Sequence, residues 1–366
     1  MSTPYLAIDL DAIEHNARVI VELCAARGVE VTAVTKGVCG HPDIARAMLR
    51  GGVSSLADSR LENVQRLQAA GIDAAGMLLR LPALSAVEQV VETVATSLNS
   101  ELAVLAGLSA AASARGRVHN VLLMVELGDL REGIPPQELL AFAGATLKLP
   151  GIHLQGLGAN LACFAGVAPT ADNMRQLAGL ADAVEQACGI TLERVSGINS
   201  SGLELLAAGG LPRRINHARI GEAILLGRET MHRKPWPGTR QNAFILQAEV
   251  LELKRKASLP RGERSEDAFG RRPQFVADRG EVWRALLNVG REDVHVDGLT
   301  PLDGRLAILG ATSGYLVMDV TPAAGSLGVG DEVAFALNYG ALLAAMTSEY
   351  VEKRPRGSTA AVTGER

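Results

Sequence analysis

Aromatic side chains are scarce in this sequence. Only 3% of its 366 residues are aromatic, so chemistry that needs a phenol has four side chains to draw on: Tyr5, Tyr315, Tyr339 and Tyr350. Cysteine is equally sparse, and the thiols at positions 24, 39, 163 and 188 have neither CxxC nor zinc-finger spacing. The chain also opens without a basic segment followed by an apolar one. We therefore expect a protein of the reducing cytoplasm.

The sequence also lacks a strong charge of one sign and a long hydrophobic run. Lys and Arg number 36 against 40 Asp and Glu, a net charge of −4, which argues against a nucleic-acid partner. No apolar stretch reaches the roughly 20 residues that a membrane helix needs. With 48% hydrophobic and 21% charged residues, the composition is typical of a soluble globular protein. At about 150 residues per domain, the length predicts two domains.

Short apolar runs alternate with longer amphipathic ones up to about residue 235. Each run has the length and β-branched character of a buried strand. The eight runs are Val31–Lys36, Val53–Ala57, Gly76–Arg80, Ala95–Leu98, Asn120–Glu126, Leu154–Asn160, Arg194–Ile198 and Ala218–Ile220. Helical stretches between them have start signals, such as Asp172 before 173–187. Eight βα units predict an α/β fold with a closed (β/α)₈ TIM-type barrel, because an open sheet of that width would be unusual.

The pattern changes after residue 236. Helical patterns disappear, and β-type runs are separated by Gly, Pro and Asp turns. We expect a barrel over 1–235, a smaller, mostly-β C-terminal domain over 236–353 and a disordered tail over 354–366. Residues 1–10 are candidates for pairing with the β domain. The charged, glycine-containing segment 257–272 reads as a loop.

Polar residues collect where the strands of the predicted barrel end, which is where such barrels carry their active sites. They are Lys36, Arg80, Arg131, Asn160, Asn199, Ser200, Ser201, Arg219, Gly221 and Glu222. Lys36 ends an otherwise apolar strand, where a charged ammonium is costly and a lowered pKa would suit an imine-forming lysine. The alternative is a lysine that extends out of the barrel mouth into water.

The loops after strands seven and eight resemble a phosphate site. Residues 197–202 join a strand to a helix and offer backbone N–H groups and hydroxyls, although an ordinary helix cap explains one serine equally well. Residues 219–222 follow at strand eight, the neighbouring position. A lysine beside a phosphate site meets the requirement of pyridoxal 5′-phosphate (PLP), but a lysine aldolase acting on a sugar phosphate would need the same pair.

At this point the sequence resembles a known family, the alanine racemases of the fold-type III PLP enzymes, and within it the ornithine racemase-like branch. The similar segments are AVTKGVCGHPDIA (33–45), LGANLACFAGVAPT (157–170), SGINSSGLELL (196–206), INHARIGEAILLGRE (215–229) and FALNYGALLAAMTSEYV (335–351). The resemblance implies a homodimer with shared active sites. It also implies an enzyme that interconverts L- and D-amino acids, with ornithine, lysine or a similar basic substrate ahead of alanine.

The resemblance also implies the roles of single residues. Lys36 would form the imine with PLP and act as one of two catalytic bases. Ser200 and the backbone at Gly221 and Glu222 would hold the cofactor phosphate, and Asn160 would lie near the ring.

Two arginines complete the implied site. Arg131 would bind the substrate carboxylate or the phenolic oxygen of the cofactor. Arg219 would face the pyridine nitrogen, where a guanidinium cannot accept a proton and so leaves the ring a poorer electron sink. That choice favours racemisation over decarboxylation. The alternative for Arg219 is an arginine paired with carboxylates of the barrel.

The chain departs from the family pattern at the second base. The family uses a tyrosine from the partner subunit, but Phe269 stands near the expected place and cannot carry a proton. We expect Tyr315 to serve instead, because it lies just ahead of Met318, whose counterpart approaches the substrate. Cys39 and His41 are reserves, since both follow the lysine closely. A tyrosine packed in the β domain is an equally good reading of Tyr315.

Further departures concern the residues around the substrate. Met124 stands where several alanine racemases have a carbamylated lysine, so Glu126 or Asp129 would have to position Arg131. The family tyrosine that follows the lysine is also missing, which leaves Tyr339 or Tyr350 as phosphate ligands.

A metal site and two other functions are alternatives to the plain racemase. His295 and Asp297 are similar to paired ligands of the metal-dependent branch of this fold type, but a surface turn explains them and we expect no metal. A PLP-dependent lyase, either a decarboxylase or a metal-assisted aldolase or dehydratase, would share the cofactor. A non-enzymatic PLP carrier would lack the β domain.

Overall fold

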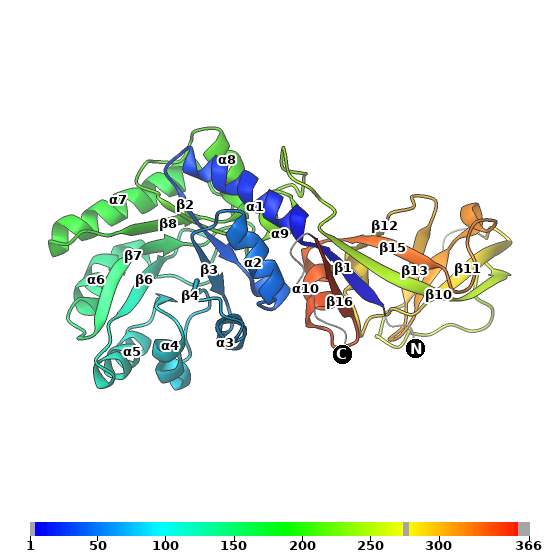
Figure 1. The fold of residues 1–366 in the computed structure, drawn as a ribbon, viewed down its shortest axis with the longest axis horizontal. Helices are drawn as coiled ribbons and strands as arrows, with labels where there is room; N and C mark the ends of the chain where they lie inside the picture. Colours follow the sequence, from blue (N-terminus) through cyan, green and yellow to red (C-terminus); the bar gives the residue numbers. More distant parts are fainter. Residues whose placement is uncertain (1–3, 274–277, 358–366) are drawn as a thin grey trace. The chain divides into compact units, whose positions relative to one another are not determined.

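The computed structural model describes residues 4–273 and 278–357, which form two compact units (Figure 1). One unit is Leu10–Gln241. The other is Asn242–Gly357 together with the N-terminal residues up to Asp9. The change of unit therefore falls after Gln241, whereas the sequence pattern placed it after residue 235.

The first unit is built around a closed barrel of eight parallel strands, which confirms the predicted fold class. The strands are β2 (Glu30–Val34), β3 (Ser55–Asp58), β4 (Ala75–Leu78), β5 (Thr96–Asn99), β6 (His119–Val125), β7 (Ile152–Ala159), β8 (Arg194–Ile198) and β9 (His217–Ile220). They follow one another around the barrel in chain order, and β9 closes it by pairing with β2. The carboxyl ends of all eight strands therefore meet at one rim.

Helices alternate with these strands along the chain. They are α1 (Leu10–Ala25), α2 (Pro42–Arg50), α3 (Leu61–Ala69), α4 (Val87–Thr93), α5 (Leu102–Ala114), α6 (Leu139–Thr146), α7 (Ala171–Cys188), α8 (Leu203–Ala207) and α9 (Glu222–Leu226). The cap of α7 is Thr170 rather than the expected Asp172, because Thr170 and Asn173 form a reciprocal capping box. Gly189 ends the helix at φ 66°, a conformation that costs glycine little.

The barrel interior is close-packed. Ala57, Met77, Leu98, Leu122 and Met124 form one buried cluster there. Strand β7 approaches its neighbour β8 so closely that a Cβ at Gly156 would lie 1.9 Å from the Arg194 carbonyl oxygen. Only glycine fits at that point.

The second unit is a mostly-β domain. Its strands are β1 (Tyr5–Asp9), β10 (Phe244–Ala257), β11 (Glu281–Leu287), β12 (Leu299–Pro301), β13 (Ala307–Ala311), β14 (Leu316–Asp319), β15 (Glu332–Leu337) and β16 (Glu352–Arg356). The sheet order is β12-β15-β10-β11-β14-β13, and β1 pairs antiparallel with β10 and parallel with β16. Residues 5–9 thus belong to the sheet of this unit.

Two expectations for this unit were wrong. The expected absence of helices fails at α10 (Tyr339–Thr347), where Asn338 caps a run of Ala, Leu and Met. Its apolar residues do not alternate with polar ones, so no helical period shows in the sequence. The expected tail from residue 354 fails at β16, because Arg354 pairs with Ala7 of β1. Residues 358–366 lie outside the described residues. Among the described helices, none has the length and apolar character to cross a membrane.

Candidate active site

The lysine of the predicted site lies at the carboxyl rim of the barrel. Lys36 opens a 3₁₀ turn (Lys36–Val38) directly after β2 and is partly exposed. Within residues 4–273 and 278–357, its Nζ makes no ion pair with a carboxylate. The preceding Thr35 hydroxyl donates to Asp58 Oδ2 at 2.7 Å. Asp58 in turn accepts from the Asn63 amide at 2.9 Å and is fully buried, which raises the pKa of its carboxyl.

Arg219 is held inside the barrel by backbone oxygens and a hydroxyl. Its Nη2 donates to the Ala159 carbonyl at 2.7 Å, and its Nη1 donates to the Ser196 carbonyl at 3.0 Å and to the Ser196 hydroxyl. Among the described residues no carboxylate pairs with it, so the alternative of an arginine neutralised by the barrel does not apply. Burial lowers the pKa of Arg219 to about 10, which leaves it charged at neutral pH.

The loops after β8 and β9 meet at one place. The Ser200 hydroxyl, buried in the 3₁₀ turn Ser200–Gly202, accepts from the Ala223 N–H at 3.2 Å. A Cβ at Gly221 would lie 3.1 Å from the Val34 Cβ of β2, so this loop also abuts the strand that carries the lysine. Within the described chain, the N–H groups of Gly221 and Glu222 have no hydrogen-bond acceptor.

Arg131 and Asn160 lie together, as the strand-end pattern predicts. The surrounding donors place the Asn160 amide oxygen toward the guanidinium, 2.7 Å from Nη1 and 3.2 Å from Nε. Glu132 binds the same guanidinium, accepting from Nε and Nη2. The side chain of Glu132 is only 12% exposed, whereas that of Arg131 is 38% exposed, so the carboxylate is largely buried and the guanidinium is open to water.

The expectation that Glu126 or Asp129 holds Arg131 was wrong. Asp129 is buried and accepts from four backbone N–H groups in the loop after β7, at 3.0 to 3.3 Å, the shortest from Phe164. Glu126 accepts from the N–H groups of Gly128 and Leu130. Both carboxylates are therefore committed to shaping loops, and Glu132 is the counter-ion.

The remaining candidates belong to the C-terminal unit. Tyr315 precedes β14 and is 47% exposed, whereas Met318 lies within β14 and is fully buried. Phe269 is exposed in its loop, 5.2 Å from the guanidinium carbon of Arg291. Tyr350 is exposed beyond the end of α10, and Tyr339 begins that helix.

Two candidate metal ligands lie on a surface turn of this unit. His295 precedes the 3₁₀ turn Val296–Gly298, and Asp297 lies in it, 4.0 Å from a guanidinium nitrogen of Arg271.

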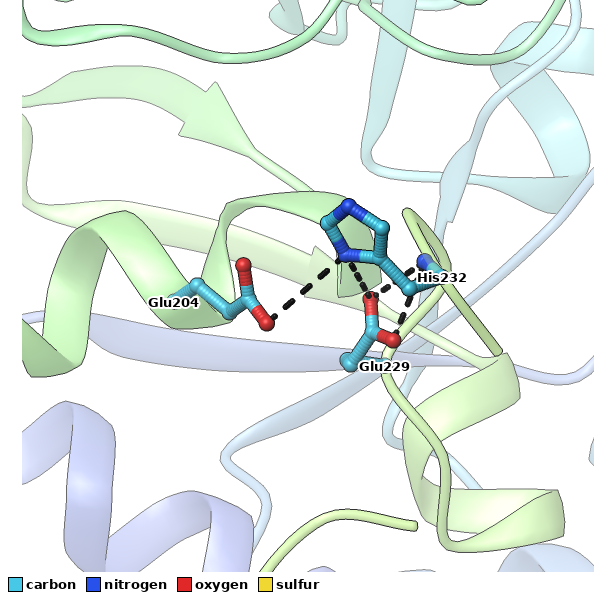
Figure 2. A group of neighbouring side chains, drawn as sticks. All are labelled: Glu204, Glu229 and His232. Atoms are coloured by element: carbon cyan, nitrogen blue, oxygen red, sulfur yellow. Dashed lines mark hydrogen bonds and ion pairs between the residues drawn. The ribbon is translucent and has the colours of Figure 1, made fainter. Parts of the chain in front are cut away.

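A different group brings three potential ligands together in the barrel unit, as Figure 2 shows: Glu204, Glu229 and His232. The His232 Nδ1 lies 3.9 Å from Glu204 and 4.0 Å from Glu229.

The carboxylate of Glu229 in this group already has a structural task. It is buried and accepts from the N–H groups of Met231, His232 and Lys234, at 2.6 to 3.0 Å. These bonds form the turn that contains a left-handed Arg233, whose side chain pairs with Glu222. The group is therefore explained by the loop alone.

The residues at the rim fit PLP. Three kinds of group follow the adjacent strands β2, β9 and β8. They are a lysine without a carboxylate partner in the described chain, two backbone N–H groups without an acceptor there, and a buried serine hydroxyl. The N–H groups and the hydroxyl are the donors that a phosphate requires, and the lysine is the group that an aldehyde requires.

Comparison with known proteins decides the family. The model of the alanine racemase N-terminal domain matches residues 8–229. The chain is 40% identical to the ornithine racemase of Acetoanaerobium sticklandii, over 96% of this chain and 99% of that protein. It is 37% identical to the lysine racemase of Thermotoga maritima, over 96% of this chain and 98% of that protein. The chain belongs to the alanine racemase family. The sequence-based expectation of a PLP-dependent amino-acid racemase is thereby confirmed.

Solved structures support the fold of this family member. An alanine racemase from Streptomyces lavendulae superposes with a TM-score of 0.74 at 20% identity, covering 98% of each chain. An alanine racemase from Bartonella henselae with covalently bound PLP also gives 0.74 at 18% identity, covering 97% of this chain and 100% of that one. A D-threonine aldolase from Filomicrobium marinum superposes with a TM-score of 0.70 at 17% identity, covering 94% of this chain and 88% of that one. At these identities the likeness concerns the fold.

Two residues of the rim were not among the sequence-based candidates. Asp58 is a charged residue at the end of a buried strand, and the cost of a charge there is the same signal that marks Lys36 in the sequence. Glu132 directly follows Arg131 and gave no separate signal, because neighbouring charges on a loop are usually solvated.

Proposed function

We propose that this racemase acts on a basic amino acid, ornithine or lysine. The observation that carries the proposal is the near-full-length identity, 40% and 37%, to racemases named for these two substrates. The matched regions cover 96% of this chain, and in such barrels the loops of the rim select the substrate.

In this proposal Lys36 carries the cofactor and moves the α-proton on one face. When bound, PLP withdraws electrons from the α-carbon of an amino acid and so makes its proton removable. The Nζ of Lys36, which has no carboxylate partner within the described chain, is free to take that proton and to return one. The hydrogen bonds from Thr35 to Asp58 hold the turn from which the lysine projects.

Arg219 limits the reaction to proton exchange. All its interactions in the barrel are donated, and the fixed guanidinium has no lone pair to accept a proton. Beside the pyridine nitrogen it would keep the electron demand moderate, so that the α-carbon is reprotonated quickly. The carbonyls of Ala159 and Ser196 hold it in that orientation.

Arg131 and Glu132 supply the charges that a basic amino acid needs. The guanidinium can bind the α-carboxylate of the substrate through donors that Glu132 leaves open, with Asn160 keeping the side chain in place. The partly buried Glu132 carboxylate is suited to the distal ammonium of ornithine or lysine. A neutral amino acid would leave that carboxylate without its second cation.

We further propose Tyr315 as the second proton carrier and a cytoplasmic homodimer as the active form. Tyr315 is 47% exposed and thus accessible to a second subunit. Light scattering tests the dimer. Tyr315→Phe should lower turnover in both directions, and unchanged rates from both enantiomers would clear Tyr315 of a proton-transfer role.

The test of the function is proton NMR in D₂O with the PLP-loaded enzyme. L-ornithine, L-lysine and L-alanine are incubated separately, and the loss of each α-proton signal is followed, with chiral chromatography of the product. Signal loss with formation of the D-enantiomer is expected fastest for a basic substrate. Lys36→Ala should abolish exchange and the cofactor absorbance, whereas the exposed Lys148→Ala should change neither. Release of an amine, pyruvate or glycine would show lyase activity and refute the proposed function.

A further inference from the structure

A fully buried histidine lies beneath Arg219 in the barrel. His217 begins β9 and has no solvent exposure. Its Nε2 lies 2.8 Å from the Thr32 hydroxyl of β2, and its Nδ1 lies 2.7 Å from the Ser196 hydroxyl of β8. Strands β2 and β8 are the two neighbours of β9, so the imidazole bridges the strands on either side of its own.

Ser196 connects this histidine to Arg219. Its hydroxyl is bound both by His217 and by the Arg219 Nη1, and its carbonyl accepts from the same Nη1 at 3.0 Å. His217 and Arg219 are two residues apart on one strand and therefore face the same side of the barrel wall. On the far side, Thr32 continues the chain to the Ser55 hydroxyl at 2.7 Å.

One arrangement of protons satisfies every group in this chain. Arginine can only donate, so the Ser196 oxygen accepts from Arg219, and His217 Nδ1 is the partner of that hydroxyl that can take its proton. The Nδ1 must then be the acceptor of the ring, which places the ring proton on Nε2, directed at Thr32. The Thr32 hydroxyl donates onward to Ser55. Every buried polar atom from Arg219 to Thr32 is then satisfied.

The charges around the imidazole favour the same state. Burial, together with the positive charges of Arg194 and Arg219, lowers the pKa of His217 well below its ordinary value. A charged ring would also carry a proton on Nδ1. That proton would face the hydroxyl proton that Ser196 directs at the same nitrogen. The ring is therefore neutral, with a single tautomer.

We propose that Ser196 and His217 are positioning residues that fix Arg219, through a one-directional chain of hydrogen bonds running from the guanidinium to Ser55. The guanidinium is the group proposed to face the pyridine nitrogen, so the functional part of this inference rests on the proposed function. The hydrogen-bond chain itself belongs to the folded barrel. Both act through Arg219, and neither is proposed to touch the reacting atoms.

The barrel provides a matched control for His217. His119 begins β6, is 2% exposed, and its Nε2 lies 2.8 Å from the Ser97 hydroxyl of the neighbouring β5. No hydrogen bond within the described chain links it to Arg219. Loss of either histidine removes a buried ring and a bond to a hydroxyl, but only His217 belongs to the chain that holds the arginine.

The first experiment is nitrogen NMR of the full-length protein labelled at histidine, with and without PLP. We expect His217 as a neutral ring protonated on Nε2, and His217→Gln assigns the signal. A ring protonated on Nδ1, or a charged ring at neutral pH, would overturn the proposed chain. The apoprotein is sufficient for this measurement, so it stands apart from whether the protein racemises a basic amino acid.

The second experiment measures cofactor affinity and the absorbance of bound PLP. Ser196→Ala and His217→Leu should weaken PLP binding by roughly tenfold, the effect of losing one hydrogen bond to a charged group, and shift the absorbance. Ser196→Thr, which keeps the hydroxyl, should restore both. His119→Leu should lower the melting temperature and leave the PLP affinity and the absorbance unchanged. If His119→Leu weakens PLP binding as much as His217→Leu does, the role of His217 is merely structural and the proposal fails.

Discussion

The buried histidines of the barrel make a quantitative prediction about acid stability. Burial lowers the pKa of His119 to about 4, against an ordinary value of 6.5. The ring is therefore neutral in the folded protein at a pH where it is charged in the unfolded chain. Because the unfolded state then binds more protons, the stability contributed by the neutral ring is complete above pH 6.5 and is lost as the pH falls toward 4.

The size of the effect follows from these two values. The complete difference corresponds to about 3 kcal/mol, and about 2 kcal/mol of it is lost between about pH 7.5 and pH 5. His119→Gln removes the titrating ring and keeps a polar group near Ser97. The variant should therefore lose about 2 kcal/mol less than the unaltered protein over that interval.

Urea unfolding of the PLP-loaded enzyme at several pH values, followed by circular dichroism, measures this difference. His153→Gln is the control for the loss of a histidine at an exposed position. His217→Gln should reduce the acid loss at least as much as His119→Gln, since His217 is fully buried. A His119→Gln protein whose stability falls as steeply with acid as that of the unaltered protein would refute the reasoning.

Four substitutions test other parts of the structure. Asp129→Asn weakens the bonds to four loop N–H groups; it should cost about 2–3 kcal/mol and speed hydrogen exchange at 163–167, and normal protection there would contradict the role. Gly156→Ala, whose Cβ would meet a carbonyl oxygen at 1.9 Å, should destabilise the barrel by about 3 kcal/mol, so an unchanged melting temperature would disprove that contact. Ser200→Ala should weaken PLP binding roughly tenfold in a fluorescence titration, and the control Ser201→Ala, at the neighbouring position, should weaken it less. Glu132→Gln should raise the KM for L-ornithine more than that for L-norvaline, which lacks the ammonium, and equal changes would exclude a contact with that group.

The local pattern of residues was sufficient for the barrel. Each buried strand is a short apolar run, and the long helices α1 and α7 are amphipathic with a 3.6-residue period, so alternation along the chain reports the order of elements. Because all strands are parallel, their carboxyl ends share a rim, and the residue pattern alone assigns Lys36, Ser200 and Arg219 to it. The N-terminal strand β1 and the helix α10 show the limit, since pairing and burial rather than local pattern define them.

What each polar group binds was decided by the tertiary structure. Asp129 reaches a loop that is distant along the chain, and the carboxylate left for Arg131 is its neighbour Glu132. His217 is an ordinary strand residue in the sequence, and only closure of the barrel places it between hydroxyls of two other strands. Hydrogen bonds are short-ranged and directional, so their partners are set by three-dimensional proximity. Hydrophobic periodicity, by contrast, follows from the local geometry of the backbone, so it can be read from residues that are neighbours in the sequence.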